Sequence, residues 1–182
     1  MRRDRVTMAG TEFAFLYFLQ SLHTPWLDSA MVFISSLGDH GRFFLLLAVI
    51  LLLFKKTRTM GAAMLFSMLL GFLIGNLWLK NMFMRQRPCW LDPTVDLLVR
   101  VPRDYSFPSG HTLIGFECAV SIWLQNRKAG AVMLVFAFLL AFSRMYLFVH
   151  FPTDVLAGAV LGSVIAWAVY RLMREIEKRR QL

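Results

Sequence analysis

His150 and Asp154 form a pair of residues whose types and spacing could do chemistry. They lie four positions apart in SRMYLFVHFPTD, residues 143–154, where one apolar stretch ends and the next begins. If a helix begins near His150, both side chains lie on one face and the carboxylate can accept a hydrogen bond from the imidazole. This contact fixes the tautomer and leaves the other ring nitrogen with a free lone pair, as a nucleophile requires. The ordinary alternative is helix capping by Asp154.

The stretch YSFPSGHT, residues 105–112, has the composition of a helix start beside an anion site. Pro108 suits the first turn of a helix, Ser109 can cap it, and Gly110 lets the backbone approach a ligand closely. Free backbone N–H groups and the helix dipole at such a start attract anions. His111 would stand beside that anion, although a plain helix start with an interfacial histidine explains the same residues.

Basic side chains gather in LKNMFMRQRPC, residues 79–89, directly after another apolar stretch. Lys80, Arg85 and Arg87 are three cations within eight residues, and Pro88 follows them. Such charges repel one another unless an anion lies among them. The alternative is that the long side chains at the end of a membrane helix reach the lipid headgroups.

Apolar stretches must position these three clusters. The chain has 182 residues, of which 58% are hydrophobic, and several stretches approach the roughly 20 residues that a bilayer helix needs. We therefore expect an all-α fold, a polytopic membrane helix bundle of about six transmembrane helices with the first one broken, as a single domain over residues 1–182. The expected spans are segment 11–38 and residues 42–56, 59–79, 109–126, 129–147 and 151–171.

Segment 11–38 is the broken one. Its apolar run is interrupted by SLHTPWLD, in which Pro25 and three polar residues prevent a continuous helix. The segment is either one kinked span or an interfacial helix followed by a span. Glu117, within the span 109–126, is an acid inside the membrane, which is either functional or a polar contact between helices.

The net charge of +9 could indicate a nucleic-acid partner, but the basic residues form short clusters between apolar stretches, so membrane topology explains them and no nucleic acid is expected. Short cytoplasmic loops accumulate Lys and Arg. If the basic clusters are cytoplasmic, segment 11–38 crosses once, both termini are cytoplasmic, and residues 80–108 and 148–152 face outward. These clusters are Arg2, Arg3 and Arg5; Lys55, Lys56 and Arg58; Arg127 and Lys128; and Arg171, Arg174, Lys178, Arg179 and Arg180.

The remaining basic residues lie on the outward side. For Arg42, Arg100 and Arg103 we expect ordinary surface charges that pair with Asp39, Asp92, Asp96 or Asp104. The others join the three polar clusters on the same face. Together they offer cations and a helix start for an anion, a histidine oriented by a carboxylate, and a second histidine. These are the parts for phosphoryl transfer through a covalent histidine intermediate.

Two further features carry less information. Cys89 and Cys118 lie in different settings, one in a loop and one deep in an apolar run, so no disulfide framework is expected. The basic start MRRDRVTMAG is not followed by a small-residue cleavage pattern after an apolar core, so we expect no removable signal peptide.

The three clusters resemble the signature motifs of the type 2 phosphatidic acid phosphatase superfamily of integral membrane lipid phosphatases. KNMFMRQRP, with six residues between Lys80 and the Arg87–Pro88 pair, resembles the first motif, and PSGH at 108–111 resembles the second. SRMYLFVHFPTD resembles the third, with five residues between Arg144 and His150 and three between His150 and Asp154.

The resemblance implies a role for each motif residue. His150 would be the nucleophile, Asp154 would orient it, and His111 would be the general acid and later the base that activates water. Arg85 is outside the signature positions and would be auxiliary. The family works without a metal or other cofactor, in line with the lack of a carboxylate cluster suited to magnesium near the motifs. The phosphate oxygens would be held by Lys80, Arg87, Ser109, the Gly110 amide and Arg144.

The expected partners are a lipid phosphate substrate and the membrane lipids, and the sequence specifies no oligomeric state. The outward site and small size favour undecaprenyl pyrophosphate as the substrate. Phosphatidylglycerol phosphate, phosphatidic acid and lipid A phosphates are the alternatives. A phosphotransferase that passes the group to a second lipid, and a non-catalytic binder of anionic lipids, are the competing functions.

Overall fold

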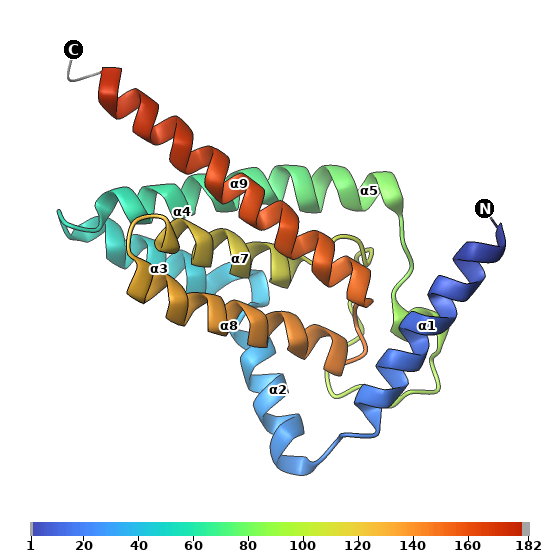
Figure 1. The fold of residues 1–182 in the computed structure, drawn as a ribbon. Helices are drawn as coiled ribbons and strands as arrows, with labels where there is room; N and C mark the ends of the chain where they lie inside the picture. The colour runs from blue at the N-terminus through green and yellow to red at the C-terminus, as the bar shows by residue number, and fades with distance from the viewer. Residues whose placement is uncertain (1, 180–182) are drawn as a thin grey trace.

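The computed structural model describes the backbone of residues 2–179 and the side chains from Gly10 onward, and it confirms an all-α protein. Long helices form a bundle, and short helical segments and loops join them at its ends (Figure 1). The elements are α1 (Arg2–Gln20), α2 (Pro25–Leu37), η1 (Asp39–Gly41), α3 (Arg42–Leu53), α4 (Arg58–Gly71), η2 (Phe72–Leu79), α5 (Lys80–Phe83), α6 (Pro88–Leu91), α7 (Gly110–Trp123), α8 (Arg127–Tyr146) and α9 (Pro152–Arg179).

Helix α7 is the central element of the bundle and packs against α4, α8 and α9. Its contact with α9 depends on small residues, because lipid-embedded helices associate by close packing. A Cβ atom at Gly158 would lie 2.7 Å from the Ser109 carbonyl oxygen, and one at Gly162 would lie 2.5 Å from that of Leu113. The two glycines thus let α9 approach the backbone of α7, which fixes the start of α7 beside the start of α9.

The protein is a membrane protein with several helical spans. Within residues 2–179, three helices are long and apolar enough to cross a bilayer: Arg58–Leu91, Arg127–Tyr146 and Pro152–Arg179. Helices α2 and α3 would make a fourth span if taken together, although they are bent by 46° at their break. The expected span 109–126 corresponds to α7, whose 14 residues are short for a bilayer helix.

We expect the N-terminal segment to be either one kinked span or an interfacial helix followed by a span. The helix does break at the predicted place, since α1 ends at Gln20 and α2 begins at Pro25. However, both helices contact the end of the bundle where α8 ends and α9 begins (Figure 1). Gln20 Nε2 donates to the Tyr146 carbonyl oxygen at 2.8 Å, and the Tyr146 hydroxyl donates to Asp28 at 2.6 Å. Polar side chains in α1 and α2 therefore hold both helices at this end of the bundle.

Candidate active site

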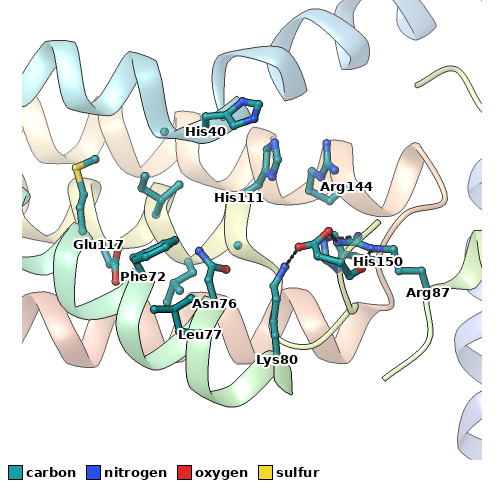
Figure 2. Close-up of a pocket in the computed structure, with 17 residues that line it drawn as sticks. His40, Phe72, Asn76, Leu77, Lys80, Arg87, His111, Glu117, Arg144 and His150 are labelled. Carbon is teal, nitrogen blue, oxygen red and sulfur yellow. Dashed lines mark hydrogen bonds and ion pairs between the residues drawn. The ribbon is translucent and has the colours of Figure 1, made fainter. Parts of the chain in front are cut away.

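A cavity of about 580 Å³ opens at this same end of the bundle. Figure 2 shows that its wall is built from η2 and α5 on one side, α7 in the middle, and the end of α8 on the other. The structure brings side chains from all three sequence clusters to it. The lining includes Lys80, Arg87, Asp104, Gly110, His111, Arg144 and His150.

Backbone hydrogen bonds join the three motif segments, which are far apart in the sequence. The Ser109 amide donates to the Asp154 carbonyl oxygen at 3.1 Å, which ties the start of α7 to the first turn of α9. The Ser106 amide donates to the Arg85 carbonyl oxygen at 2.8 Å, which ties the loop before α7 to the first motif. These main-chain hydrogen bonds hold the three segments side by side, and with them the side chains of the site.

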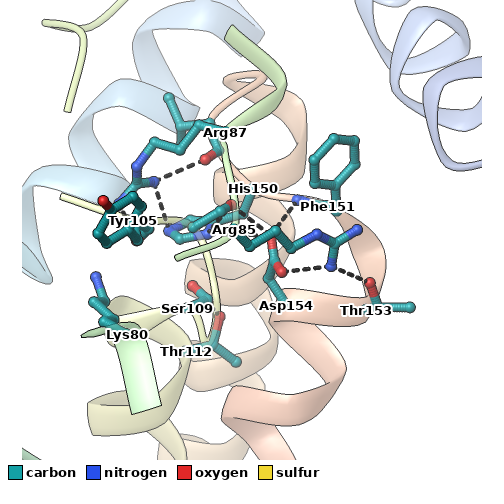
Figure 3. Close-up of polar contacts among 12 residues, drawn as sticks. Lys80, Arg85, Arg87, Tyr105, Ser109, Thr112, His150, Phe151, Thr153 and Asp154 are labelled. Carbon is teal, nitrogen blue, oxygen red and sulfur yellow. Dashed lines mark hydrogen bonds and ion pairs between the residues drawn. The ribbon is translucent and has the colours of Figure 1, made fainter. Parts of the chain in front are cut away.

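His150 is buried in the turn between α8 and α9 and has a defined tautomer. Its Nε2 lies 3.0 Å from Arg87 Nη1. A guanidinium can only donate, so Nε2 must accept and the ring proton must be on Nδ1. The nitrogen that carries the lone pair therefore faces the cations of the cavity, as a nucleophile attacking a bound anion requires (Figure 3).

Asp154 acts on His150 through a residue that the sequence did not indicate. The Asp154 Oδ2 atom is 3.7 Å from His150 Nδ1, too far for the direct hydrogen bond that we expected. Ser106 lies between them: its hydroxyl donates to Oδ2 at 2.5 Å and lies 3.3 Å from Nδ1. In this geometry the Ser106 hydroxyl bridges the Asp154 carboxylate and the His150 imidazole, so the carboxylate acts on the ring through Ser106.

The surroundings of His150 keep its ring neutral. Burial, together with the positive charges of Arg87, Arg144 and Lys80, lowers the pKa of His150 well below the ordinary value for histidine. Only the neutral ring has a lone pair to attack with, so any activity that depends on it falls as the pH drops through this pKa. Because the pKa is low, His150 remains a competent nucleophile in mildly acidic solution.

We expect NMR of protein labelled with 15N-histidine to show His150 neutral at pH 6.5, with the proton on Nδ1. An unperturbed histidine would be about half protonated at that pH. The signal is assigned by its disappearance in the His150→Ala variant. A protonated ring at pH 6.5, or a neutral ring with its proton on Nε2, would contradict this description.

Three buried cations surround the cavity. The exposed fractions are 6% for Lys80, 2% for Arg87 and 6% for Arg144. Arg144 donates to Ser35, while its buried Nε has no hydrogen-bond partner among the described residues. An unpaired donor on a buried cation is costly, and a bound anion would satisfy it.

Asp104 supplies the carboxylate that faces these cations. It bonds to Lys80, and its Oδ1 accepts from Arg87 Nη2 at 2.8 Å. Burial alone would raise the pKa of the Asp104 carboxyl, but the charges of Lys80 and Arg87 lower it well below its ordinary range. The carboxylate thus occupies a position between the two cations that we expected to hold phosphate.

His111 stands in the first turn of α7, in the middle of the cavity wall and between Lys80 and Arg144 (Figure 2). Its Nε2 is 2.9 Å from Asp39 Oδ1, a partner that the sequence did not indicate. The chain approaches the ring closely here, since a Cβ atom at Gly38 would lie 2.5 Å from His111 Cδ2. The carboxylate fixes the orientation of the ring, as general acid and base catalysis requires.

The start of α7 is where the second motif predicts it, with two differences. Pro108 precedes the helix, and although Ser109 is the N-cap residue its side chain makes no capping hydrogen bond. Instead the buried Ser109 hydroxyl accepts from Thr112 Oγ1 at 3.0 Å. Gly110 lines the cavity, and a Cβ atom there would lie 3.0 Å from Asn76 Oδ1.

Other residues singled out in the sequence have different surroundings. Arg85 is bonded to Asp154. Glu117 is buried beside the cavity, and its Oε1 has no hydrogen-bond partner among residues 2–179. The expected aspartate pairs of the surface arginines are absent from the described part of the chain: Asp104 pairs with Lys80 and Arg87 instead, and Arg42 contacts His40.

Comparisons with known proteins identify the family of the chain. The family model of the PAP2 superfamily matches residues 60–178. The chain is 37% identical over 145 residues to an undecaprenyl-diphosphatase from Sulfolobus acidocaldarius, with 78% of this chain and 68% of that protein covered. It is 31% identical over 153 residues to the undecaprenyl-diphosphatase BcrC of Bacillus subtilis, with 83% and 77% covered.

A solved structure gives the same result for the fold. The chain superimposes on the crystal structure of a PAP2-type phosphatidylglycerolphosphate phosphatase from Bacillus subtilis with a TM-score of 0.79 and 29% sequence identity. The match covers 93% of this chain and 88% of that one. With the family model and the relatives, this likeness shows that the chain belongs to the PAP2 superfamily and is a membrane phosphatase acting on lipid phosphates.

Proposed function

We propose that residues 1–182 form one catalytic domain that hydrolyses a lipid phosphate or pyrophosphate through a phosphohistidine at position 150. The observation that carries the proposal is the contact of His150 Nε2 with Arg87, beside the other buried cations of the cavity. A nucleophile and the groups that would hold its target thus lie around one cavity. No step of the proposed reaction requires a metal ion.

In the first step, Nε2 of His150 attacks phosphorus while the bond to the leaving oxygen breaks. In the ligand-free protein, Arg87 donates to this nitrogen. A bound phosphate would offer oxygens to Arg87 and so free the lone pair of Nε2. Lys80, Arg87, Ser109, the Gly110 amide and Arg144 would hold the phosphate oxygens and stabilise the charge that grows on them.

His111 would supply the proton for the leaving oxygen. The phosphorylated imidazole of His150 carries a positive charge, which Asp154 would stabilise through Ser106. In the second step, His111 would take a proton from water as that water attacks phosphorus and the P–N bond breaks. Phosphate then leaves, and both histidines return to their starting states.

Undecaprenyl pyrophosphate is the proposed substrate. The two relatives compared above are both named for undecaprenyl diphosphate, and the prenyl tail is a hydrocarbon that could extend between apolar helices. Phosphatidylglycerol phosphate is the alternative supported by the name of the solved structure. Phosphatidic acid and lipid A phosphates are the remaining alternative substrates.

The proposed activity is tested by offering detergent-solubilised protein a panel of lipid phosphates and pyrophosphates in the presence of EDTA. We expect phosphate release that is fastest with undecaprenyl pyrophosphate. Phosphate release only from glycerophospholipid phosphates would mean that the substrate is a glycerophospholipid, although the proposed reaction would still hold. Labelled phosphate that appears in a second lipid would indicate a transferase, and binding with no turnover of any lipid would indicate a binder.

We also propose that the cavity faces outward and that the opposite end of the bundle is cytoplasmic. Basic residues collect at that opposite end, where Lys56 and Arg174 line a second cavity with Asn126. The contacts of α1 and α2 support an N-terminal region that reaches the outer end of the bundle. The side chains of Arg2, Arg3 and Arg5, and the whole of Arg180, lie outside the described residues.

Cysteine labelling in intact cells tests this orientation. We expect a membrane-impermeant maleimide to label Ser21→Cys from outside, and to label Lys56→Cys and Lys128→Cys only after permeabilisation. All three positions are exposed, and because Cys89 and Cys118 are buried the unmodified protein serves as the background control. The reverse pattern would place the cavity in the cytoplasm.

Asp104 is expected to compete with phosphate for Lys80 and Arg87. Replacing Asp104 with asparagine removes that charge, so inorganic phosphate should inhibit the enzyme about three- to tenfold more strongly, a factor within the range of one ordinary hydrogen bond. The measurement is the inhibition constant of phosphate, with Asp96→Asn as the control on an exposed side chain of the same loop. An unchanged or weaker inhibition would mean that Asp104 is not displaced.

A further inference from the structure

Arg85 connects the first motif to the acid of the third. Its Nη1 donates to Asp154 Oδ1 and to Thr153 Oγ1, both at 2.6 Å (Figure 3). The guanidinium also lies over the ring of Phe151, with its central carbon 4.3 Å from the ring centroid. These contacts hold Arg85 in one orientation against the start of α9.

Glu12, in α1, completes the arrangement from the other side. Its Oε2 accepts from Arg85 Nη2 at 2.6 Å, while Oε1 accepts from the amide and the hydroxyl of Thr153 at 3.1 and 2.6 Å. The Glu12 side chain is only 11% exposed. A buried carboxylate that bonds both Arg85 and the backbone of α9 joins α1 to the catalytic turn.

The two carboxylate oxygens of Asp154 have different hydrogen-bond partners. Oδ2 accepts from Ser106 and from the Phe151 amide, on the side that faces His150. Oδ1 accepts from Arg85. The carboxylate can therefore rotate only if the contact with Arg85 breaks, and Arg85 in turn is held by Glu12.

The charges of this group bear on the proposed chemistry. Glu12, Arg85 and Asp154 together carry a net charge of minus one, because one cation is shared between two carboxylates. When His150 is phosphorylated its ring becomes positively charged, and this negative group would stabilise it. Loss of Glu12 alone would leave the group neutral, and loss of Arg85 alone would leave two carboxylates facing each other.

We propose that Glu12 and Arg85 are positioning residues that act on the chemical step through Asp154, and that α1 is therefore part of the catalytic unit. The inference rests on the proposed phosphohistidine mechanism. It assigns a catalytic consequence to a helix that lies outside all three motifs and outside the residues matched by the family model, 60–178.

The test compares Glu12→Gln, Arg85→Gln and the double variant, each as purified full-length protein of matched thermal stability. We expect Glu12→Gln to lower kcat about tenfold, with KM changed less than about twofold, because the change acts on Asp154 and not on the lipid. The rate of phosphoenzyme formation in a single turnover should fall by the same factor. Arg85→Gln should be impaired more strongly.

The double variant restores the net charge of minus one, so its loss should be smaller than the product of the two single losses. Tyr17→Phe is the matched control: it removes a different polar contact of α1, the hydrogen bond to Asp92 at 2.6 Å, without touching Arg85. The kcat of Tyr17→Phe should stay within about twofold of that of the unmodified protein, because this exposed hydrogen bond only helps to hold α1 against the bundle.

Two results would overturn the inference. One is a Glu12→Gln protein with unchanged kcat and an unchanged rate of phosphoenzyme formation. The other is a loss in Tyr17→Phe equal to that in Glu12→Gln, which would show that α1 matters only as a docked helix. Both require active unmodified protein, whereas an unmodified protein that releases no phosphate from any lipid would instead refute the proposed function.

Discussion

Replacing His150 with alanine is expected to lower kcat by at least about three orders of magnitude, because the variant has no group to accept the phosphoryl group. Lipid binding should persist, since the cations of the cavity remain. Glu12, Arg85 and Asp154 do not depend on the imidazole for their own contacts, so the fold should be preserved. The measurements are phosphate release under saturating lipid, and binding of the same lipid to the variant.

His23→Ala is the control for this prediction. His23 stacks on Tyr146 and lies 3.3 Å from its carbonyl oxygen, outside the lining of the cavity. It should retain activity within about twofold of the unmodified protein, as expected for a substitution away from the site. A His150→Ala protein that keeps a tenth or more of the activity would mean that water attacks the lipid phosphate directly.

Replacing His111 with asparagine is expected to lower turnover of lipid substrates by about two to four orders of magnitude, the usual contribution of a general acid and base. A lipid phosphate monoester releases an alkoxide, which leaves poorly without a proton. Undecaprenyl pyrophosphate releases a lipid phosphate, which leaves more readily, so with this substrate the loss arises mainly in the second step, where water lacks its base. A nitrophenyl phosphate has a leaving group that needs no proton, so this variant should still form the phosphoenzyme from it.

The same variant lacks the base that activates water. Hydrolysis of its phosphoenzyme should be slow, so nitrophenol should appear as a single burst of one equivalent per active site. The measurement is a rapid-mixing time course, with His23→Asn as the control. Steady turnover of nitrophenyl phosphate at the unmodified rate, with no burst, would contradict the assignment of His111 to both steps.

Much of the site was predictable because its chemistry is concentrated in short segments. The spacing of His150 and Asp154, the glycine at the start of α7, and the cations after an apolar stretch all indicate function locally. The contacts of Arg87 with both His150 and Asp104 agree with the expected anion site. Signals of this kind need no knowledge of the path of the chain.

The hydrogen-bond partners of these residues were not predictable, because they lie far away in the sequence. Asp39 reaches His111 across 72 positions, and Glu12 reaches Thr153 across 141. Ser106 lies within the stretch YSFPSGHT, but a serine two positions before a proline gives no sign that it stands between His150 and Asp154. Only the tertiary packing brings these side chains together: η1 carries Asp39 to His111, and α1 carries Glu12 to Thr153.

The path of the N-terminal segment was also not predictable from apolar runs alone. From hydropathy and charge alone, an apolar segment of this length is expected to cross the bilayer. Polar residues inside it, Gln20 and Asp28 among them, bond to the end of α8, and hydropathy gives no sign of these contacts. The bend between α2 and α3 depends on the positive φ angles of His40 and Gly41, a local feature that hydropathy does not reveal.

In the proposed reaction His150 carries the phosphoryl group. The most direct measurement is to mix the protein with labelled lipid pyrophosphate, quench within milliseconds in alkali, and locate the label by mass spectrometry. We predict an acid-labile, alkali-stable phosphate on the peptide that contains His150, absent from His150→Ala and more abundant in His111→Asn. Rapid turnover with label on no histidine, or on His111, would contradict this account.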